Sequence, residues 1–318
     1  MTATASVAIA IATMQRPDML GALLAQLQLL VVLDATVEIL VVDNDPKESA
    51  RPVVEALRAA GTLRFEVRYL TDPRRGIPFV RNTAVAAALA AGASHVLFID
   101  DDELPERDWL NALLHVMNIY DAAVVAGPSL STLPTGTPAW AKGNAFQHES
   151  HRTGDPLETC ATNNTLVKRA VFERLNPWFD ERLALTGGSD RHFFLRAHDA
   201  GFRIVWAAEA AVREDVPTSR VNIPWVLTRM YRQGACNAFC EIDLERKPLA
   251  RLQMLAQGAV FVAGGAALAP LGVLSALKPA RRGQRLLKYA RYAAYGVGLI
   301  ATATGQGLYE EYKTIHGR

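Results

Sequence analysis

Hydrophobic positions in the first hundred residues recur in short, evenly spaced blocks. Four apolar, strand-like runs are centred near Ile9, Ile39, Val67 and Leu97. The stretches between these runs carry apolar residues at helical spacing, and strands that alternate with helices in this way are typical of βαβ units. We therefore expect an α/β fold with a mostly parallel sheet, covered by helices on both faces, and a ligand site beyond the carboxyl ends of its strands.

The pattern is less regular after residue 120. Residues 122–126 read as a fifth strand, and the Pro, Gly, Ser and Thr-rich stretch 127–159 is expected to be irregular and functional. Further strands are expected at residues 165–167 and 203–206, and helices at 170–175 and 190–200. Because the composition shifts near Pro224, we expect a body of residues 1–225, divided near residue 127, and a separate tail of residues 226–318.

Charge separates the body from the tail. Residues 1–225 contain 21 lysines and arginines against 27 acidic residues, whereas residues 226–318 contain 13 against 5. A basic tail on an acidic body indicates an anionic partner, either lipid headgroups or nucleic acid. Three cysteines without a CxxC pair disfavour a zinc site or a disulfide scaffold, and no basic segment precedes the first apolar run. We therefore expect the body in the cytoplasm.

The tail also contains a long uncharged segment, residues 252–277. Its length suffices to cross a bilayer, and a buried helix pair is the alternative. A single crossing would put the basic residues that follow outside the cell, against the positive-inside rule. These residues are Lys278, Arg281, Arg282, Arg285, Lys288 and Arg291. Because Gly264-Gly265 and Pro270 allow a break or a re-entrant hairpin, we expect a monotopic anchor on an anionic membrane surface, and no nucleic-acid partner.

The clearest candidate for chemistry is an acidic cluster. The apolar run that starts at His95 ends in Asp100, Asp101, Asp102 and Glu103. Four carboxyl groups at the end of a buried strand repel one another, and a hard divalent cation such as Mg²⁺ or Mn²⁺ relieves this repulsion. Strand alternation favours Asp100 and Asp102 as the metal-facing pair. The alternative is a solvated acidic turn that caps the next helix.

A second candidate is the segment Gly187-Gly188-Ser189-Asp190, which opens a helix. Ser189 is expected to be the N-cap, and the helix dipole keeps Asp190 ionised. An ionised carboxylate beside a Gly-Gly turn can act as general base towards a hydroxyl nucleophile. The alternative is simply a well-capped helix.

Two further residues could bind a nucleotide. Asp43 ends the second strand and could accept hydrogen bonds from a base or ribose, although an Asx turn is equally compatible. Arg81 could reach a diphosphate, although a solvated helix face is the competing interpretation. The sequence contains no GxGxxG and no Walker motif, so neither a dinucleotide oxidoreductase nor a P-loop NTPase has support.

The order of these motifs resembles the family 2 glycosyltransferases of the GT-A fold, over about residues 6–234. The resemblance rests on Thr13 with Arg16-Pro17, Asp43-Asn44, Gly76 to Asn82, Asp100 to Asp102 and Gly187 to Asp190. Within that family the chain is most similar to bacterial exopolysaccharide glucosyltransferases of the succinoglycan type. Ser189 departs from the family, where the residue before the base is commonly acidic. The QxxRW motif of processive synthases is absent, which indicates that one sugar is added per event.

The resemblance implies a role for each residue. Asp43 would contact the nucleobase of a nucleoside diphosphate sugar, a UDP-sugar being favoured, and Arg81 would lie near the nucleotide. Asp100 and Asp102 would form the DxD motif, with Asp102 the direct ligand of Mn²⁺ or Mg²⁺. Thr13, Arg16 and Asp101 would complete the donor site, and Asp190 would be the base of an inverting transfer. The acceptor would be a polyprenyl-linked saccharide; no particular oligomeric state is implied.

Two other functions remain open from the residues alone. One is a catalytically silent scaffold that binds a sugar nucleotide within a membrane assembly complex, against which the intact Asp102 and Asp190 argue. The other is a nucleotidyltransferase, which would require a Gly-rich basic loop after the first strand, where this chain has only residues 13–17.

Overall fold

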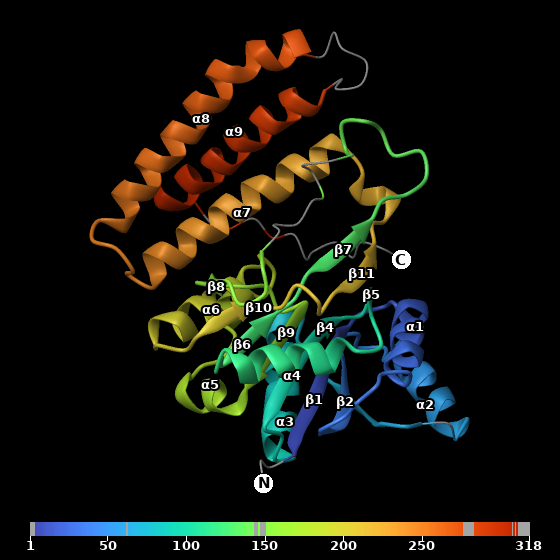
Figure 1. Ribbon diagram of the computed structural model, residues 1–318. Coiled ribbons are helices and arrows are strands. Elements are labelled where there is room, and N and C mark those ends of the chain that lie inside the picture. Colours follow the sequence, from blue (N-terminus) through green and yellow to red (C-terminus); the bar gives the residue numbers. More distant parts are fainter. Residues whose placement is uncertain are drawn as a thin grey trace.

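The computed structural model describes residues 4–61, 63–142, 146, 151–275, 283–306, 308 and 310. Figure 1 shows an α/β body with a layer of three long helices lying across one end of it. The helices are α1 (Pro17–Leu27), α2 (Arg51–Ala59), α3 (Ile77–Ala90), α4 (Trp109–Ile119), α5 (Arg169–Arg174), α6 (Ser189–Asp199), α7 (Ile223–Asp243), α8 (Ala250–Ser275) and α9 (Gln284–Ala303). Pro17, Pro52, Pro78 and Pro224 each occupy the first helical turn, where the missing N–H costs no hydrogen bond.

The body is built on an eight-stranded, mostly parallel sheet, as the βαβ spacing predicts. In spatial order its strands are β3 (Glu66–Thr71), β2 (Ala35–Asp43), β1 (Ala5–Thr13), β4 (His95–Asp100), β9 (Asn164–Lys168), β6 (Val124–Ala126), β10 (Ile204–Trp206) and β8 (Pro156–Leu157). In β1, Ile9 pairs with Ile39 of β2 on one side and with Leu97 of β4 on the other. β9 runs antiparallel to both β4 and β6, and β8 runs antiparallel to β10.

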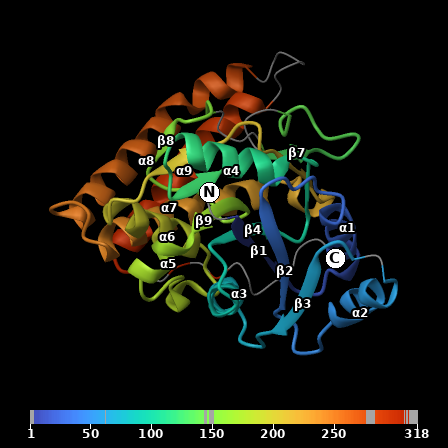
Figure 2. The ribbon, with the colours of Figure 1, turned by 60° about the horizontal axis from the view of Figure 1, so that its bottom comes forward.

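Side-chain alternation along β1 divides the core between the two faces of the sheet. Ile9 and Ile11 pack in a cluster that contains the buried residues of α1 and α4, including Trp109. Ala8 and Ala10 point to the other face, where α3, α5 and α6 contribute a cluster with Phe193. The view of Figure 2 shows helices on either side of the sheet. Burial on both faces explains why these strands are almost continuously apolar.

A second, three-stranded sheet lies at the carboxyl end of the first, and the periodicity did not predict it. Its order is β5 (Glu103–Pro105), β11 (Val212–Asp215) and β7 (Ser129–Thr132). β11 pairs antiparallel with β5 and parallel with β7. Part of the stretch 127–159, which was expected to be irregular, forms β7 of this sheet and β8 of the eight-stranded sheet. The strands are short and pair residues more than eighty positions apart, such as Glu103 with Glu214, so no local pattern marks them.

The described part of the tail contains α8, α9 and all of α7 after its first three residues, and the expected break in its apolar segment is not found. α8 runs without interruption from Ala250 to Ser275 and contains Pro270. Two of its glycines are points of close approach to α9: a Cβ at Gly265 would lie 2.7 Å from the carbonyl oxygen of Tyr289, and one at Gly272 would lie 2.8 Å from Cα of Leu286. The hairpin is therefore formed between α8 and α9, and not within α8.

The outer helix of this layer has the composition of a membrane segment. Within the described ranges, Ala250–Val273 is the one stretch long and apolar enough to cross a membrane, with a mean hydropathy of 1.6, and 17% of it is buried. Exposed apolar side chains along α8 are Leu252, Val260, Leu268, Leu271 and Val273. Lys278, Arg281 and Arg282, which were expected to contact lipid, lie outside the described residues.

Candidate active site

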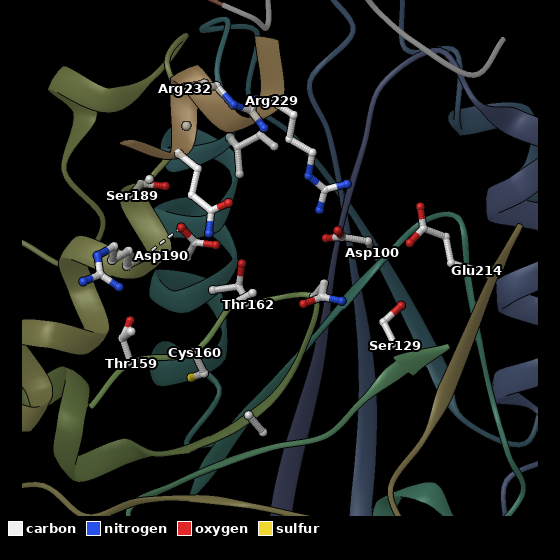
Figure 3. A pocket seen from close by; sticks show the side chains of 18 of the residues that line it. Asp100, Ser129, Thr159, Cys160, Thr162, Ser189, Asp190, Glu214, Arg229 and Arg232 are labelled. Carbon is white, nitrogen blue, oxygen red and sulfur yellow. Dashed lines mark hydrogen bonds between the residues drawn. The ribbon is translucent and has the colours of Figure 1, made fainter. Parts of the chain in front are cut away.

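An open cleft lies where the carboxyl ends of β1 and β4 and the start of α6 face the layer of α7, α8 and α9. Its volume of about 1450 Å³ exceeds that of a typical small-ligand pocket, so it has room for two substrates. Thr13, Arg16 and Arg81, Asp100 to Asp102 and Asp190 all line it, as the motif order predicts. Figure 3 shows Asp100 and Asp190 pointing into this cavity from different elements.

The aspartate cluster begins at the end of β4, and its members have different partners. Asp101 is buried; the Thr13 hydroxyl donates to it at 2.8 Å and Arg16 Nη1 at 3.0 Å. Arg16 Nη1 also contacts Asp102 Oδ2 at 3.1 Å, and Arg220 Nη2 approaches the same oxygen at 3.9 Å. Since β4 ends at Asp100, the predicted strand alternation does not extend to Asp102, and a turn orients both following carboxylates.

Asp100 faces the cleft itself. Its side chain retains 45% of its surface, but this surface opens into the cavity, with Arg81 Nη2 at 3.9 Å. The surrounding protein removes bulk water and raises the pKa of Asp100 to about 7, and Asp102 and Asp101 raise it further while Arg81 opposes the shift. Burial likewise raises the pKa of Asp101 to about 6. A divalent cation would relieve this crowding, so the all-oxygen residues of the cluster fit Mn²⁺ or Mg²⁺.

Glu103 is the fourth acidic residue of the cluster, and the sequence alone indicated no separate role for it. It is buried, and it accepts hydrogen bonds from the backbone N–H of Asp100 at 3.2 Å and from Asn163 Nδ2 at 2.7 Å. Burial raises its pKa well above the ordinary value, with the Asp100 charge adding to the effect. Glu103 therefore holds the backbone of Asp100 in position at the wall of the cleft.

Asp43 is the one predicted site residue that does not line the cleft. It is fully buried, and its carboxylate accepts hydrogen bonds from the backbone N–H groups of Asp45 and Ala50, both at 2.8 Å, and from the Tyr69 hydroxyl at 2.9 Å. These contacts order the loop between β2 and α2, whose Asn44 does line the cleft. The nucleobase contact of Asp43 stays a prediction, whereas its role in holding this loop is visible.

Asp190 lies in the first turn of α6 and lines the cleft. The N-cap is Gly188 and not Ser189 as expected, and no side chain caps this helix. Gly187 and Gly188 have φ of 77° and 89°, a conformation that strongly favours glycine. A Cβ at Gly188 would lie 3.0 Å from Cβ and Sγ of Cys236 on α7. The turn that presents Asp190 is therefore packed directly against the helical layer.

The helical layer forms the roof of the cleft, which we define as the lining residues of α7, α8 and α9. These are Trp225, Arg229, Met230, Arg232, Gln233, Asn237, Phe261, Lys288, Arg291, Tyr292 and Tyr295. Figure 3 shows Arg229 and Arg232 across the cavity from Thr162 and Cys160. Lys288 and Arg291 were expected to face lipid and instead line the cleft. Their spacing with Tyr292 and Tyr295 marks one helix face, which is the signal that could have revealed them.

A separate group outside the cleft also has metal-ligand geometry. Ligand atoms of Asp180, His192 and Asp243 lie within 4.8 Å of one another. Arg182 already occupies this position, with Nη2 at 2.6 Å from Asp180 and 2.7 Å from Asp243. His192 Nε2 lies 3.0 Å from Asp243. Because the guanidinium of Arg182 already bridges both carboxylates, this group fastens α7 to α6 and to the turn before it.

A mostly parallel sheet with an aspartate cluster at the end of a central strand is typical of the GT-A class of glycosyltransferase folds. The chain belongs to glycosyl transferase family 2, whose family model matches residues 8–175, just over half of the chain. The predicted family and fold are thereby confirmed, and the protein is a glycosyltransferase.

Individual relatives agree with this assignment. The chain is 31% identical over 236 residues to the succinoglycan biosynthesis protein ExoM of Rhizobium meliloti, covering 73% of this chain and 74% of ExoM. It is 26% identical over 171 residues to the glycosyltransferase AglE of Haloferax volcanii, covering 54% of each. In structure it is similar to the mannosyltransferase PcManGT of Pyrobaculum calidifontis, solved with GDP-Man and Mn²⁺, with a TM-score of 0.62, 18% identity and coverage of 91% and 85%. TarS 1-349 of S. aureus, solved with UDP-GlcNAc, gives 0.54 at 16% identity, with coverage of 95% and 92%.

Proposed function

We propose that the protein transfers one sugar from a nucleoside diphosphate sugar, with inversion, to a lipid-linked saccharide in exopolysaccharide or cell-envelope glycan synthesis. Residues 1–127 would bind the donor, and residues 128–225 would bind the acceptor beneath the tail of residues 226–318. The observation that carries the proposal is the pairing of two acidic sites across one cleft. A metal-type cluster ends β4, and a carboxylate at the start of α6 faces the same space.

The two acidic sites have different roles in the reaction. The acceptor hydroxyl oxygen attacks the anomeric carbon while the bond from that carbon to the diphosphate oxygen breaks. Asp190 takes the hydroxyl proton, and the electron pair of the broken bond leaves on the diphosphate. Arg16 and Arg81, beside the aspartate cluster, are positioned to stabilise the charge that develops there. A bound Mn²⁺ or Mg²⁺, held by Asp100 and Asp102, would supply Lewis-acid stabilisation of the same leaving group.

The donor and the acceptor follow from the relatives by analogy. PcManGT was solved with GDP-Man and TarS 1-349 with UDP-GlcNAc, which supports a nucleoside diphosphate sugar, and we favour a UDP-sugar. ExoM is a succinoglycan biosynthesis protein, which supports an exopolysaccharide acceptor on a polyprenyl carrier. The long, apolar and mostly exposed helix α8 supports association with a membrane. We place the protein on the cytoplasmic face as a monotopic protein, an arrangement that keeps its basic residues inside the cell.

A donor screen tests the proposal. Purified protein would be incubated with UDP- and GDP-sugars and Mn²⁺, and release of the nucleoside diphosphate would be measured with and without acceptor. We expect release from one donor, faster with acceptor, and a product of inverted anomeric configuration by NMR. Donor binding without any turnover would instead indicate a silent scaffold.

The Asp190→Asn variant tests the base. General-base removal typically costs about a hundred- to ten-thousandfold in turnover, and donor affinity should be nearly unchanged because a base acts in the transition state. Asp18→Asn is the matched control, since Asp18 is an exposed aspartate in the first turn of α1 and does not line the cleft. Equal turnover in the two variants, or a loss confined to donor binding, would reject the assignment.

A further inference from the structure

Arg220 lines the cleft, but it belongs to none of the motifs that the sequence marks. It ends a short 3₁₀ turn, Thr218–Arg220, which connects β11 of the second sheet to α7 of the roof. Its backbone N–H donates to the carbonyl of Pro217 at 2.9 Å, and its side chain is 20% exposed. Arg220 therefore enters the cleft from the junction between the body and the helical layer.

Two contacts fix the position of the Arg220 guanidinium. Its Nη1 donates to Oε1 of Glu214 on β11 at 2.8 Å, and its Cζ lies 5.9 Å from the ring centroid of Trp225 on α7. The Trp225 ring is itself stacked on Phe146, with ring centroids 5.9 Å apart. Because a carboxylate and an aromatic ring already order this guanidinium, a ligand that binds it pays little for fixing the side chain.

The other terminal nitrogen of Arg220 approaches the aspartate cluster without bonding to it. Nη2 lies 3.9 Å from Oδ2 of Asp102, which is beyond hydrogen-bond distance, and Arg16 Nη1 already donates to the same oxygen at 3.1 Å. Among the residues that the structure describes, Arg220 makes one side-chain hydrogen bond, the one to Glu214. A guanidinium carries five N–H donors, so Nη2 can bind a second anion while Nη1 stays on Glu214.

Glu214 also connects this pair electrostatically to the cluster. It pairs in register with Glu103, the residue that follows Asp102, and Figure 3 shows both Glu214 and Asp100 at the cavity. Burial raises the pKa of Glu214, and the charge of Asp102 adds to the shift while Arg220 opposes it. Arg220 therefore acts on the same carboxylates that are assigned to the metal and the leaving group.

We propose that Arg220 is a further catalytic residue, which binds the diphosphate of the sugar donor through Nη2, and that Glu214 is a positioning residue, which holds Arg220 through Nη1. This inference rests on the proposed function, because the donor belongs to that reaction. When the bond from the anomeric carbon to the diphosphate oxygen breaks, its electron pair passes to that oxygen, and the guanidinium stabilises the added negative charge. Arg16 approaches the cluster from the start of α1, whereas Arg220 approaches it from the link to α7. The donor is thereby contacted from both halves of the body.

The affinities for UDP and UMP test this assignment, because the two nucleotides differ by one phosphate. Both would be measured by calorimetry in the presence of Mn²⁺, with GDP and GMP in parallel. Arg220→Gln should weaken binding of the diphosphate about ten- to a hundredfold, the usual effect of losing one charge-assisted hydrogen bond, and leave the monophosphate nearly unaffected. The kcat for transfer should fall about tenfold as well, because the charge on the diphosphate grows as the bond breaks.

Three further variants separate binding from folding. Arg213→Gln is the matched control and should change neither affinity nor kcat, since Arg213 precedes Glu214 on β11, pairs with the exposed Glu106 at 2.8 Å and does not line the cleft. Arg220→Lys keeps the charge but has a single nitrogen, so it should recover the melting temperature more fully than the diphosphate affinity, and it replaces Arg220→Gln if that variant does not fold. Glu214→Gln should weaken diphosphate binding less than Arg220→Gln does, because its amide oxygen still accepts from Nη1.

Three outcomes would overturn the role of Arg220. Equal weakening of UDP and UMP binding would place its effect outside the second phosphate, and unchanged binding of both would make its contact with Glu214 purely structural. A larger loss in Glu214→Gln than in Arg220→Gln would mean that the carboxylate itself holds the nucleotide through its metal.

Failure of the proposed function gives a different result. If the wild type binds UDP or GDP but turns over no donor, the transferase reaction is rejected, and the difference between diphosphate and monophosphate binding still decides the role of Arg220. If transfer proceeds and Arg220→Gln leaves that difference unchanged, the reaction stands and the role of Arg220 is rejected. A wild type that binds none of the four nucleotides would reject both.

Discussion

The floor and the roof of the cleft are built on different principles. The floor consists of carboxylates at strand ends and in the first turn of a helix, and two of them, Asp101 and Glu103, are buried. The roof consists of arginine, lysine and tyrosine side chains on long helices, and several of them are exposed. The aspartate cluster lies within the residues that match the family model, whereas the roof lies entirely beyond them.

This difference predicts that the two sides of the cleft contribute differently to catalysis and to substrate binding. A buried carboxylate is held by backbone and arginine contacts and can act on a reacting atom without rearranging. A long cationic side chain at a cleft edge selects a charged substrate and contributes to binding more than to bond breaking. Changes to the floor should therefore reduce turnover, and changes to the roof should reduce acceptor affinity.

The largest expected effect is on the aspartate cluster. EDTA should abolish transfer and Mn²⁺ or Mg²⁺ should restore it, and Asp102→Asn should reduce turnover by about a hundredfold or more, as for other groups that stabilise a developing charge. Asp101→Asn is the comparison, because Asp101 is buried against Thr13 and Arg16 and should mainly lower the melting temperature. Full activity in EDTA, or equal losses in both variants, would mean that the cluster is only a structural turn.

A smaller effect is expected where floor and roof meet, at Gly188. An alanine there must adopt a φ of 89° and approach Cys236 at 3.0 Å. Gly201→Ala is a matched control, since its φ is 87° and no atom lies within 4 Å of the added Cβ. The strained φ alone should cost about 1 kcal/mol in each variant. Only Gly188→Ala should cost more in urea unfolding and slow turnover as well, because Asp190 follows two residues later.

If the two glycine variants lose equal stability and both keep full turnover, the contact between α7 and the Asp190 turn has no role in positioning the base. The position of Asp190 would then be independent of the packing of α7 against its turn.

The smallest expected effect concerns the two ends of β4. Burial lowers the pKa of His95 at its start to about 4, and raises that of Asp100 at its end to about 7. As the pH falls below about 6.5, His95 takes up a proton in the unfolded chain but not in the folded protein. Proton uptake therefore favours the unfolded chain, and the folded protein loses stability as the pH falls from about 6.5 towards 4. Between pH 7 and pH 5 this loss is at most about 2 kcal/mol.

Asp100 acts in the opposite direction over the same range, so the comparison must be made between variants. His95→Gln should lose less stability than the wild type when urea unfolding at pH 5 is compared with pH 7. If His95→Gln and the wild type lose the same stability between pH 7 and pH 5, His95 titrates normally in the folded protein.

Much of the donor side could be predicted from local pattern. The thirty-residue spacing identified the parallel sheet, and an apolar strand ending in acids marked the cluster at Asp100. The charge pattern of the tail did not identify the roof. Lys288 and Arg291 follow a long apolar segment, and a lipid headgroup and a substrate phosphate attract them equally, so their charge alone does not distinguish the two. The second sheet was missed because Glu103 and Glu214 pair across the whole body.

By itself, the sequence determined the family, the order of the strands along the chain and the glycines before Asp190, because each depends on neighbours within a few residues. Only the tertiary structure decided what surrounds each charged group. It buried Asp43 in its own loop, made Gly188 and not Ser189 the N-cap, kept α8 continuous, and turned Lys288 and Arg291 towards the cleft. The physical reason is that hydration, charge pairing and close packing depend on groups brought together from distant positions, which no local pattern encodes.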